Sequence, residues 1–307
     1  MTHERSEGEK QLLAYKICDL YPSFQACWDE LSKKDLGEQL ELWRRYLLHC
    51  PGLWEKQVSC YAEEGLDWRA IVKERVLPHL DERRSAMERA RQALHGVIGP
   101  VCLKAQERLG LDFEVLFVIY VGMGCGAGWA TELCGKPACL LGLENIAELG
   151  WLEEDTLSAL LAHELGHLFH GIWRKRAGLE GLEEHTDPFW QLYVEGFAQR
   201  SEHLIGGKET WHEASGQGGW LDWCGKNKGR LAALFLEKAK EGDVKDFFGS
   251  WFAIEGRSQT GYFLGHELVK SWEEDAPLRE IAVLPAEEVR RRAKECLVRL
   301  AAEGALP

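Results

Sequence analysis

The sequence predicts an α+β fold that is predominantly helical. Residues 1–110 are rich in Leu, Trp, Glu and Arg, and apolar residues recur at helical spacing, as at Leu36, Leu40 and Trp43, without a strand pattern. After residue 110, two short stretches have the character of buried strands, and they precede an amphipathic helix with two histidines. We therefore expect a helical N-terminal domain over residues 1–110. Residues 111–307 are expected to form a second domain with a small sheet and a helical C-terminal part.

The first expected strand is Phe113–Val121, the only long run of β-branched and aromatic residues. It leads into Gly122–Gly128, which holds four glycines in seven residues. The Lys-Ser/Thr pair of a phosphate-binding loop does not follow, so nucleotide binding is not expected. The second expected strand is Ala138–Leu143, and Glu144-Asn145 connects it to the next helix.

The next element is expected to be an amphipathic helix over Asp155–Trp173, with Asp155 or Thr156 as its N-cap. Apolar residues at helical spacing predict the face that packs on the core. A different face carries the sequence HELGH at residues 163–167. The pentapeptide is thus expected in the middle of a helix that has one buried apolar face and one polar face.

Residues 163–167 have the composition of a hydrolytic zinc site. His163 and His167 lie one helical turn apart, so both imidazoles can reach one ion from the same face. Glu164 would stand beside the ion, where it can accept a proton from a water that zinc has acidified. Such a site needs a third protein ligand and an open fourth position.

A second helix is expected after this one. Asp187 as N-cap and Pro188 at the first helical position predict its start. The helix is expected to run to Ile205 and to end at Gly206-Gly207.

Glu195, within this second helix, is the expected third ligand. It lies among apolar residues, where a carboxylate needs a partner, and the small residues after it allow close approach to a neighbouring helix. His170 is a weaker candidate because a straight helix carries it a further turn from the ion. His185 and Asp187 remain alternative ligands from the loop between the helices.

The HELGH segment, followed by a helix with Glu195-Gly196-Phe197-Ala198, resembles the gluzincins. These zinc peptidases include thermolysin and the membrane-alanyl-aminopeptidase type. The stretch from about residue 115 to 270 is most similar to an uncharacterised bacterial group of predicted zinc-dependent proteases. The resemblance implies a metallopeptidase in which His163, His167 and Glu195 bind zinc (Zn2+) and Glu164 is the general base. It also implies an edge strand beside the metal, with which substrate backbone pairs.

The sequence departs from related patterns at two positions. A metzincin would need a histidine at position 173, which is Trp173, so that class is excluded. Thermolysin-like members carry an Asp where this chain has Gln199, which leaves the partner of the zinc histidines open; Glu202 or a backbone carbonyl could fill that role. Residues 142–145 also resemble a segment by which aminopeptidases hold a free amino terminus, although a helix-capping turn is the favoured interpretation.

Peptide hydrolysis places negative charge on the carbonyl oxygen, so a nearby hydrogen-bond donor is expected. Residues 257–267 contain Tyr262 and His266 one helical turn apart. The similar bacterial group carries a like Gly-Tyr-x-x-Gly segment, which implies that Tyr262 is this donor. A packing role for Tyr262 is the alternative, and Tyr193 and Tyr120 are rival donors.

The net charge of −13 makes nucleic acid and anionic membranes unfavourable partners. The charged N-terminal segment does not look like a signal peptide, and no apolar run has the length of a membrane span. The ten cysteines fit no short zinc-finger spacing and are expected as thiols in a reducing cytoplasm. A peptide or protein substrate is the expected partner, and the oligomeric state is left open.

Two other functions stay open on the residues alone. The first is a zinc protein of similar fold that lacks peptidase activity and serves as an interaction module. The second is a hydrolase that acts on a non-peptide bond. Glu164 argues against a purely structural site, because a structural site needs no base and usually closes its fourth position.

Overall fold

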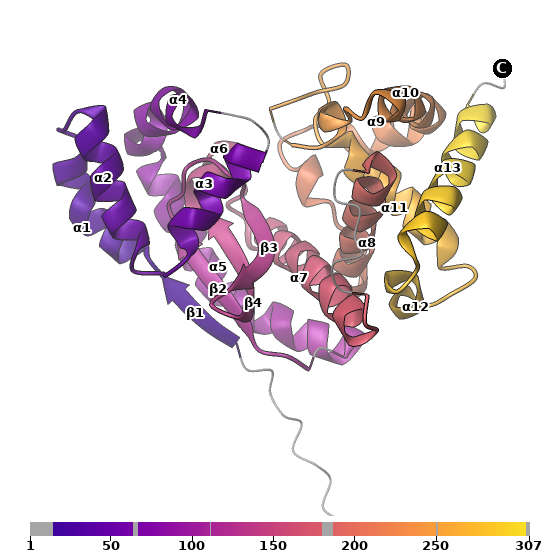
Figure 1. The fold of residues 1–307 in the computed structure, drawn as a ribbon, viewed down its shortest axis with the longest axis horizontal. Coiled ribbons are helices and arrows are strands. Elements are labelled where there is room, and N and C mark those ends of the chain that lie inside the picture. Colours follow the sequence, from indigo (N-terminus) through magenta and orange to yellow (C-terminus); the bar gives the residue numbers. More distant parts are fainter. Residues whose placement is uncertain (1–14, 64–66, 111, 180–186, 250, 305–307) are drawn as a thin grey trace, which may run out of the picture.

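The computed structural model describes residues 15–63, 67–110, 112–179, 187–249 and 251–304. Within them the chain is mostly helical and contains a four-stranded mixed sheet (Figure 1), which confirms the predicted α+β, predominantly helical fold class. The strands are β1 (Tyr15–Asp19), β2 (Val115–Tyr120), β3 (Gly128–Leu133) and β4 (Lys136–Gly142). The α-helices are α1 (Tyr21–Leu31), α2 (Leu36–Leu47), α3 (Leu53–Glu63), α4 (Trp68–Ile71), α5 (Leu80–Leu109), α6 (Leu143–Leu149), α7 (Glu154–Arg176), α8 (Pro188–Gly206), α9 (Trp220–Lys226), α10 (Lys228–Glu241), α11 (Thr260–Trp272), α12 (Leu278–Ala282) and α13 (Ala286–Glu303). Short helical turns are η1 (Val72–Val76), η2 (Leu77–His79), η3 (His212–Ala214) and η4 (Lys245–Phe247).

The sheet has the strand order β1-β2-β4-β3. The pairs β1–β2 and β2–β4 are parallel, whereas β3 runs antiparallel to β4. Strands β2 and β4 lie in the middle, and their nearly continuous apolar sequence fits strands covered on both faces. Both predicted strands are confirmed, since the stretch 113–121 contains β2 and the stretch 138–143 overlaps β4.

Two strands were missed. The prediction that no strand precedes residue 110 was wrong, because β1 lies there and pairs in parallel with β2. Strand β1 has only five residues, lies at a sheet edge and is partly exposed, so it lacks the apolar alternation by which strands are found. The other missed strand, β3, forms the opposite edge and is also only partly buried. The division into two domains at residue 110 stays a prediction, although β1–β2 pairing crosses that boundary.

The long helix α5 lies against α6, α7 and α8, and it joins the N-terminal helices to the rest of the molecule (Figure 1). Gly110 ends α5 in the left-handed conformation at φ 68°, which glycine adopts without steric cost. Helices α7 and α8 pack on each other, and α11 packs on the other side of α8. Strand β3 lies beside α7, so an open sheet edge borders the helix with the two histidines.

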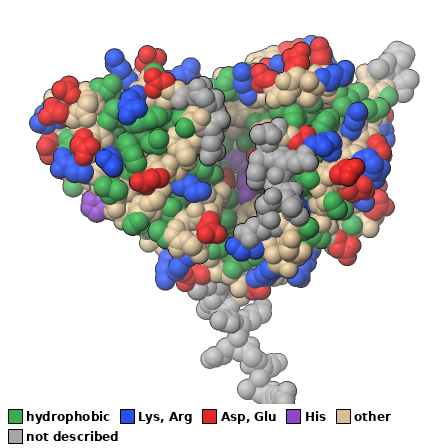
Figure 2. All heavy atoms as spheres, in the orientation of Figure 1, with side chains coloured by type: hydrophobic (Ala, Val, Ile, Leu, Met, Phe, Trp, Pro, Cys, Tyr) green, Lys and Arg blue, Asp and Glu red, His purple; other side chains and the backbone are tan. Residues whose placement is uncertain are grey.

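No helix among the described residues is both long and apolar enough to cross a bilayer. The N-terminal helices α1–α4 occupy one end of the molecule, and α9–α13 occupy the other (Figure 1). Figure 2 shows a hollow between these two ends, with histidine side chains visible in its depth.

Candidate metal centre

Helix α7 positions the HELGH residues. It begins at Glu154 with Glu153 as N-cap, so the predicted cap at Asp155 or Thr156 was two or three residues too late. The N-cap makes no side-chain hydrogen bond; acidic residues in the first turn and basic residues in the last instead complement the helix dipole. The predicted apolar stripe is confirmed, and its buried members are Leu157, Leu161, Leu165 and Leu168.

Helix α8 positions the third candidate ligand. The side chain of Asp187 accepts a hydrogen bond from the backbone N–H of Phe189 at 3.1 Å, which confirms the predicted N-cap. The helix ends at Gly206, one residue beyond the predicted end, with Gly207 left-handed at φ 73°. Capping at both ends fixes the first and last residues of α8. It thereby helps to set the position along the helix axis at which Glu195 faces α7.

Small residues bring α8 close to its two neighbours. A Cβ at Gly166, inside the HELGH segment, would lie 2.8 Å from the Cα of Ala198. On the other side of α8, a Cβ at Gly196 would overlap the backbone of Gly265 on α11. The close packing predicted from the small residues of α8 is thus confirmed, and it carries Glu195 toward the histidines.

The side chains of His163, His167 and Glu195 meet at one point. The Nε2 atoms of His163 and His167 are 3.1 Å apart, and Glu195 Oε2 lies 3.3 Å from the first and 3.4 Å from the second. Ligands about 2.0–2.1 Å from a tetrahedral ion are separated by roughly 3.3–3.4 Å, so the sides of this triangle are close to those of a metal-ligand set. The three groups can hold a metal ion.

Charge compensation supports the same arrangement. Burial tends to raise the pKa of Glu195, but His167 and His163 outweigh burial and hold this pKa below its usual range. A carboxylate that stays ionised is the form that binds a cation. Two imidazoles and one carboxylate form a donor set that zinc commonly takes in hydrolytic sites.

Glu164 is buried at the edge of this triangle. Burial raises its pKa, while His167 and His163 oppose the rise, and the backbone of Ala130 on β3 opposes it as well. A Cβ at Gly128, the first residue of β3, would overlap the carboxylate of Glu164. The glycine therefore leaves room for this carboxylate between α7 and the edge strand.

These residues lie in a cleft of about 840 Å³. Strand β3 borders it with Trp129 and Ala130, and α8 borders it with Trp190 and Val194. The cleft is the hollow in Figure 2. Among the described residues, its other lining side chains are Cys125, Ala127, Asn145, Leu149, Trp151, Leu160, His163, Glu164, His167, His170, Gln191, Glu195, His212, Gln259 and Tyr262.

Tyr262, at the start of α11, faces this cleft. Its ring centroid lies 5.6 Å from that of His163, and burial together with Glu195 raises the pKa of its hydroxyl well above the usual value. The hydroxyl therefore stays protonated and can act as a hydrogen-bond donor. Its rivals lie elsewhere: Tyr193 donates to the backbone oxygen of Ile281 at 2.8 Å, and Tyr120 is buried in strand β2.

The weaker ligand candidates do not join the triangle. His170 Nε2 lies 3.0 Å from the hydroxyl of Tyr193. Asp187 caps α8 and accepts a hydrogen bond from Arg290 Nε at 2.9 Å. His185 lies outside the described residues. His266, on α11, packs its ring at a tilted angle against His203 and edge-on against Trp211.

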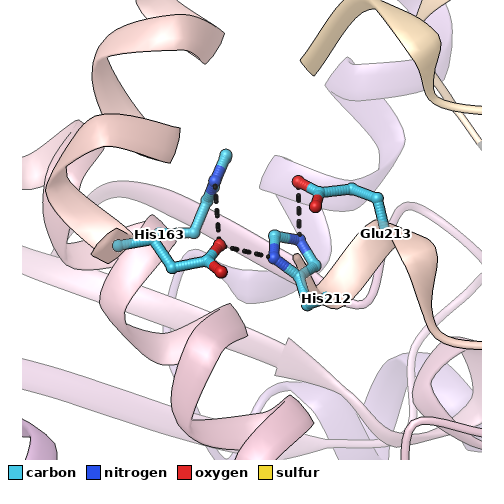
Figure 3. Close-up of side chains that lie close together, drawn as sticks. His163, His212 and Glu213 are labelled. Carbon is cyan, nitrogen blue, oxygen red and sulfur yellow. Dashed lines mark hydrogen bonds and ion pairs between the residues drawn. The ribbon is translucent and has the colours of Figure 1, made fainter. Parts of the chain in front are cut away.

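Sequence reasoning missed two buried residues behind the triangle. His212 and Glu213 lie in the turn η3, and Figure 3 shows them next to His163. His212 Nδ1 is 2.8 Å from Glu202 Oε2, and His212 Nε2 is 3.4 Å from Glu213 Oε1. His163 Nδ1 is 3.9 Å from the same Glu202 oxygen. A His-Glu pair in a single-turn element has no periodicity that would have revealed this proximity.

Burial governs the ionisation of this second group. It raises the pKa of Glu202 to about 7 against the opposing effect of His163, and that of Glu213 to about 8 against the effect of His212. It also lowers the pKa of His212. The group is therefore a buried polar cluster in which few net charges are present at neutral pH.

Glu144 has a role that neither sequence interpretation foresaw. It lies in the first turn of α6 without capping that helix, and it is 1% exposed. Its carboxylate accepts hydrogen bonds from the backbone N–H groups of Gly122 at 2.7 Å and Gly124 at 3.1 Å. Glu144 thus anchors the glycine-rich turn after β2.

Comparison of the chain with protein-family models, with curated proteins and with solved structures gives no match. The family resemblance therefore stays a prediction. What the structure contributes is a group of three side chains with the size and charge of a metal site, next to a buried carboxylate and a large cleft.

Proposed function

We propose that this protein is a zinc-dependent metallopeptidase of the gluzincin type. The observation that carries the proposal is the triangle of His163, His167 and Glu195, with the carboxylate of Glu164 beside it in the cleft. Zinc bound there would supply Lewis-acid chemistry, which acidifies a water and polarises the carbonyl of the bond to be cut.

The chain's own residues have distinct roles in the proposed reaction. Glu164 accepts a proton from the attacking water and passes it to the nitrogen of the leaving amine. Its raised pKa suits this exchange, because a carboxylate with a higher pKa is a stronger base. The hydroxyl of Tyr262 donates a hydrogen bond to the carbonyl oxygen as negative charge develops there.

The borders of the cleft support an extended peptide as substrate. Strand β3 is a sheet edge whose outward backbone groups can pair with an added strand. Trp129 and Trp190 supply apolar walls for side chains of such a peptide. Peptides and proteins are the proposed partners, and the cytoplasm is the proposed location.

Internal bonds are the proposed targets. A peptidase that removes terminal residues needs a charged group to hold the free terminus. The carboxylate of Glu144, which the sequence offered for that purpose, is occupied by two backbone N–H groups. Among the described residues that line the cleft, the carboxylates are Glu164 and Glu195, and no Lys or Arg is present.

The proposal is tested by comparing the wild type with Glu164→Gln on a peptide library with free and with blocked termini. The variant should retain its metal and lose at least about 100-fold in kcat, because the base is gone. Blocked peptides should be cut as well as free ones. Glu154→Gln, an exposed change in the first turn of the same helix, is the matched control and should behave as the wild type.

Two results would contradict the proposal. A wild type that binds metal and cuts no peptide would favour the interaction module or a non-peptide substrate. A Glu164→Gln variant with unchanged turnover would remove Glu164 from the chemistry.

A further inference from the structure

The carboxylate of Glu202 lies behind the metal centre, between two imidazoles. Its side chain is fully buried, and His163 and His212 are only 2% and 4% exposed. Three elements supply the group: α7 supplies His163, α8 supplies Glu202 and η3 supplies His212. Figure 3 shows His163 and His212 side by side. A buried carboxylate at such a junction is costly unless donors satisfy it.

The orientation of His163 determines which of its atoms faces Glu202. Its Nε2 faces the other two ligands at 3.1 and 3.3 Å, so Nδ1 points to the opposite side. A histidine that binds metal through Nε2 carries its proton on Nδ1. This Nδ1 is buried and has no hydrogen-bond partner among the described residues, and Glu202 Oε2 faces it at 3.9 Å. A shift of about 1 Å would bring the two atoms into hydrogen-bond range.

The same carboxylate holds His212. The distance of 2.8 Å from His212 Nδ1 to Glu202 Oε2 is that of a hydrogen bond. It is shorter than the separation of roughly 3.3 Å between two atoms that share one tetrahedral ion. A shared proton accounts for this contact, although Glu202, His212, His163 and Glu213 together also form a group whose ligand atoms could hold a metal ion.

We propose that Glu202 is a positioning residue that orients His163 and His212 together. It accepts the Nδ1 proton of the metal ligand on one side and the Nδ1 proton of a cleft-lining histidine on the other. It stands in for the aspartate that is absent at Gln199, whose side chain instead donates to the backbone oxygen of Thr210 at 2.9 Å. The inference rests on the proposed metal site, because the orientation of His163 matters only if Nε2 binds the ion.

The test is the metal affinity of folded protein, measured by competition with a chromogenic zinc chelator. Glu202→Gln should lose roughly 10–100-fold in affinity, the usual effect of removing the partner of a ligating histidine. Glu213→Gln is the matched control, because Glu213 is equally buried and contacts His212 instead of His163. Its affinity should stay close to that of the wild type. The thermal stability of the metal-free forms is measured in parallel.

Glu202→Asp provides a second variant in case Glu202→Gln does not fold. It keeps the carboxyl group but withdraws it by one methylene, so the metal affinity should fall by roughly tenfold. If both Glu202 variants bind metal as tightly as the wild type, the role of Glu202 is refuted and the proposed function still stands. An equal loss in Glu213→Gln, or two zinc ions per wild-type chain, would also refute that role. A wild type that binds no metal would overturn the proposed function as well.

Discussion

The Cα of Gly166 lies against the backbone of Ala198, so that a Cβ at position 166 would be only 2.8 Å from the Cα of Ala198. Gly166 stands between the two histidines on α7, and Ala198 lies one turn after Glu195 on α8. The approach of these two backbones therefore sets the distance between the histidine pair and Glu195, the proposed third ligand.

Gly166→Ala should weaken metal binding. The added methyl group must push α8 outward, and overpacking of this kind typically costs about 1–3 kcal/mol. If Glu195 moves away with the helix, the metal affinity should fall by at least roughly tenfold, which corresponds to about 1.4 kcal/mol. Titration with zinc in a competing chelator measures this. Gly171→Ala is the control, because it lies on the same helix with open space around it. Equal affinities in the two variants would refute the role of this contact.

Tyr262→Phe should lower kcat by roughly 100-fold and leave the metal content unchanged. The reason is that the hydroxyl is proposed to act only as negative charge develops on the carbonyl oxygen. Tyr193→Phe is the control, since its hydroxyl donates to Ile281 away from the reacting atoms. That variant should lose about 1 kcal/mol of stability and keep its kcat. Wild-type kcat in Tyr262→Phe would return this residue to a packing role.

The stability of the metal-free protein should depend on pH through Glu144. Burial raises the pKa of this carboxyl from 4.5 to about 7, against the opposing hydrogen bonds from Gly122 and Gly124. Between these values the folded state binds more protons than the unfolded state, so the free energy of unfolding falls as pH rises. The contribution is complete below about pH 4.5 and is lost as pH rises through about 7, a total of about 3 kcal/mol.

Urea unfolding at pH 5, 6, 7 and 8 in the presence of a chelator measures this effect in the wild type and in Glu144→Gln. The stability of the wild type relative to the variant should decline from pH 5 to pH 8. A difference that does not change with pH would show that Glu144 ionises at its ordinary value.

The helices of the site could be predicted because their signals are local. Asp187 and Pro188 mark the start of α8 by capping and by backbone restriction, and a stripe of leucines reveals the buried face of α7. The approach of Glu195 to His163 was expected from the same local patterns together with the family resemblance. The sheet centre was predictable for a similar reason, since fully buried strands are apolar throughout.

The remaining features depend on contacts between distant segments. Strand β1 is stabilised by pairing with β2, and Tyr15 lies opposite Val115, far along the chain. His212 reaches Glu202, behind the proposed metal centre, because the chain folds back after α8, which no local pattern reports. Edge strands such as β3 are half-exposed and escape detection by hydrophobic patterns.

We propose that His163, His167 and Glu195 bind one metal ion. The most direct test is elemental analysis by mass spectrometry of protein purified without added metal. Wild type and the control Gln191→Ala, which changes a cleft residue on the same helix as Glu195, should each hold about one zinc ion per chain. Glu195→Ala should be largely free of zinc. Full zinc occupancy in Glu195→Ala, or none in the wild type, would show that these three residues do not form the site.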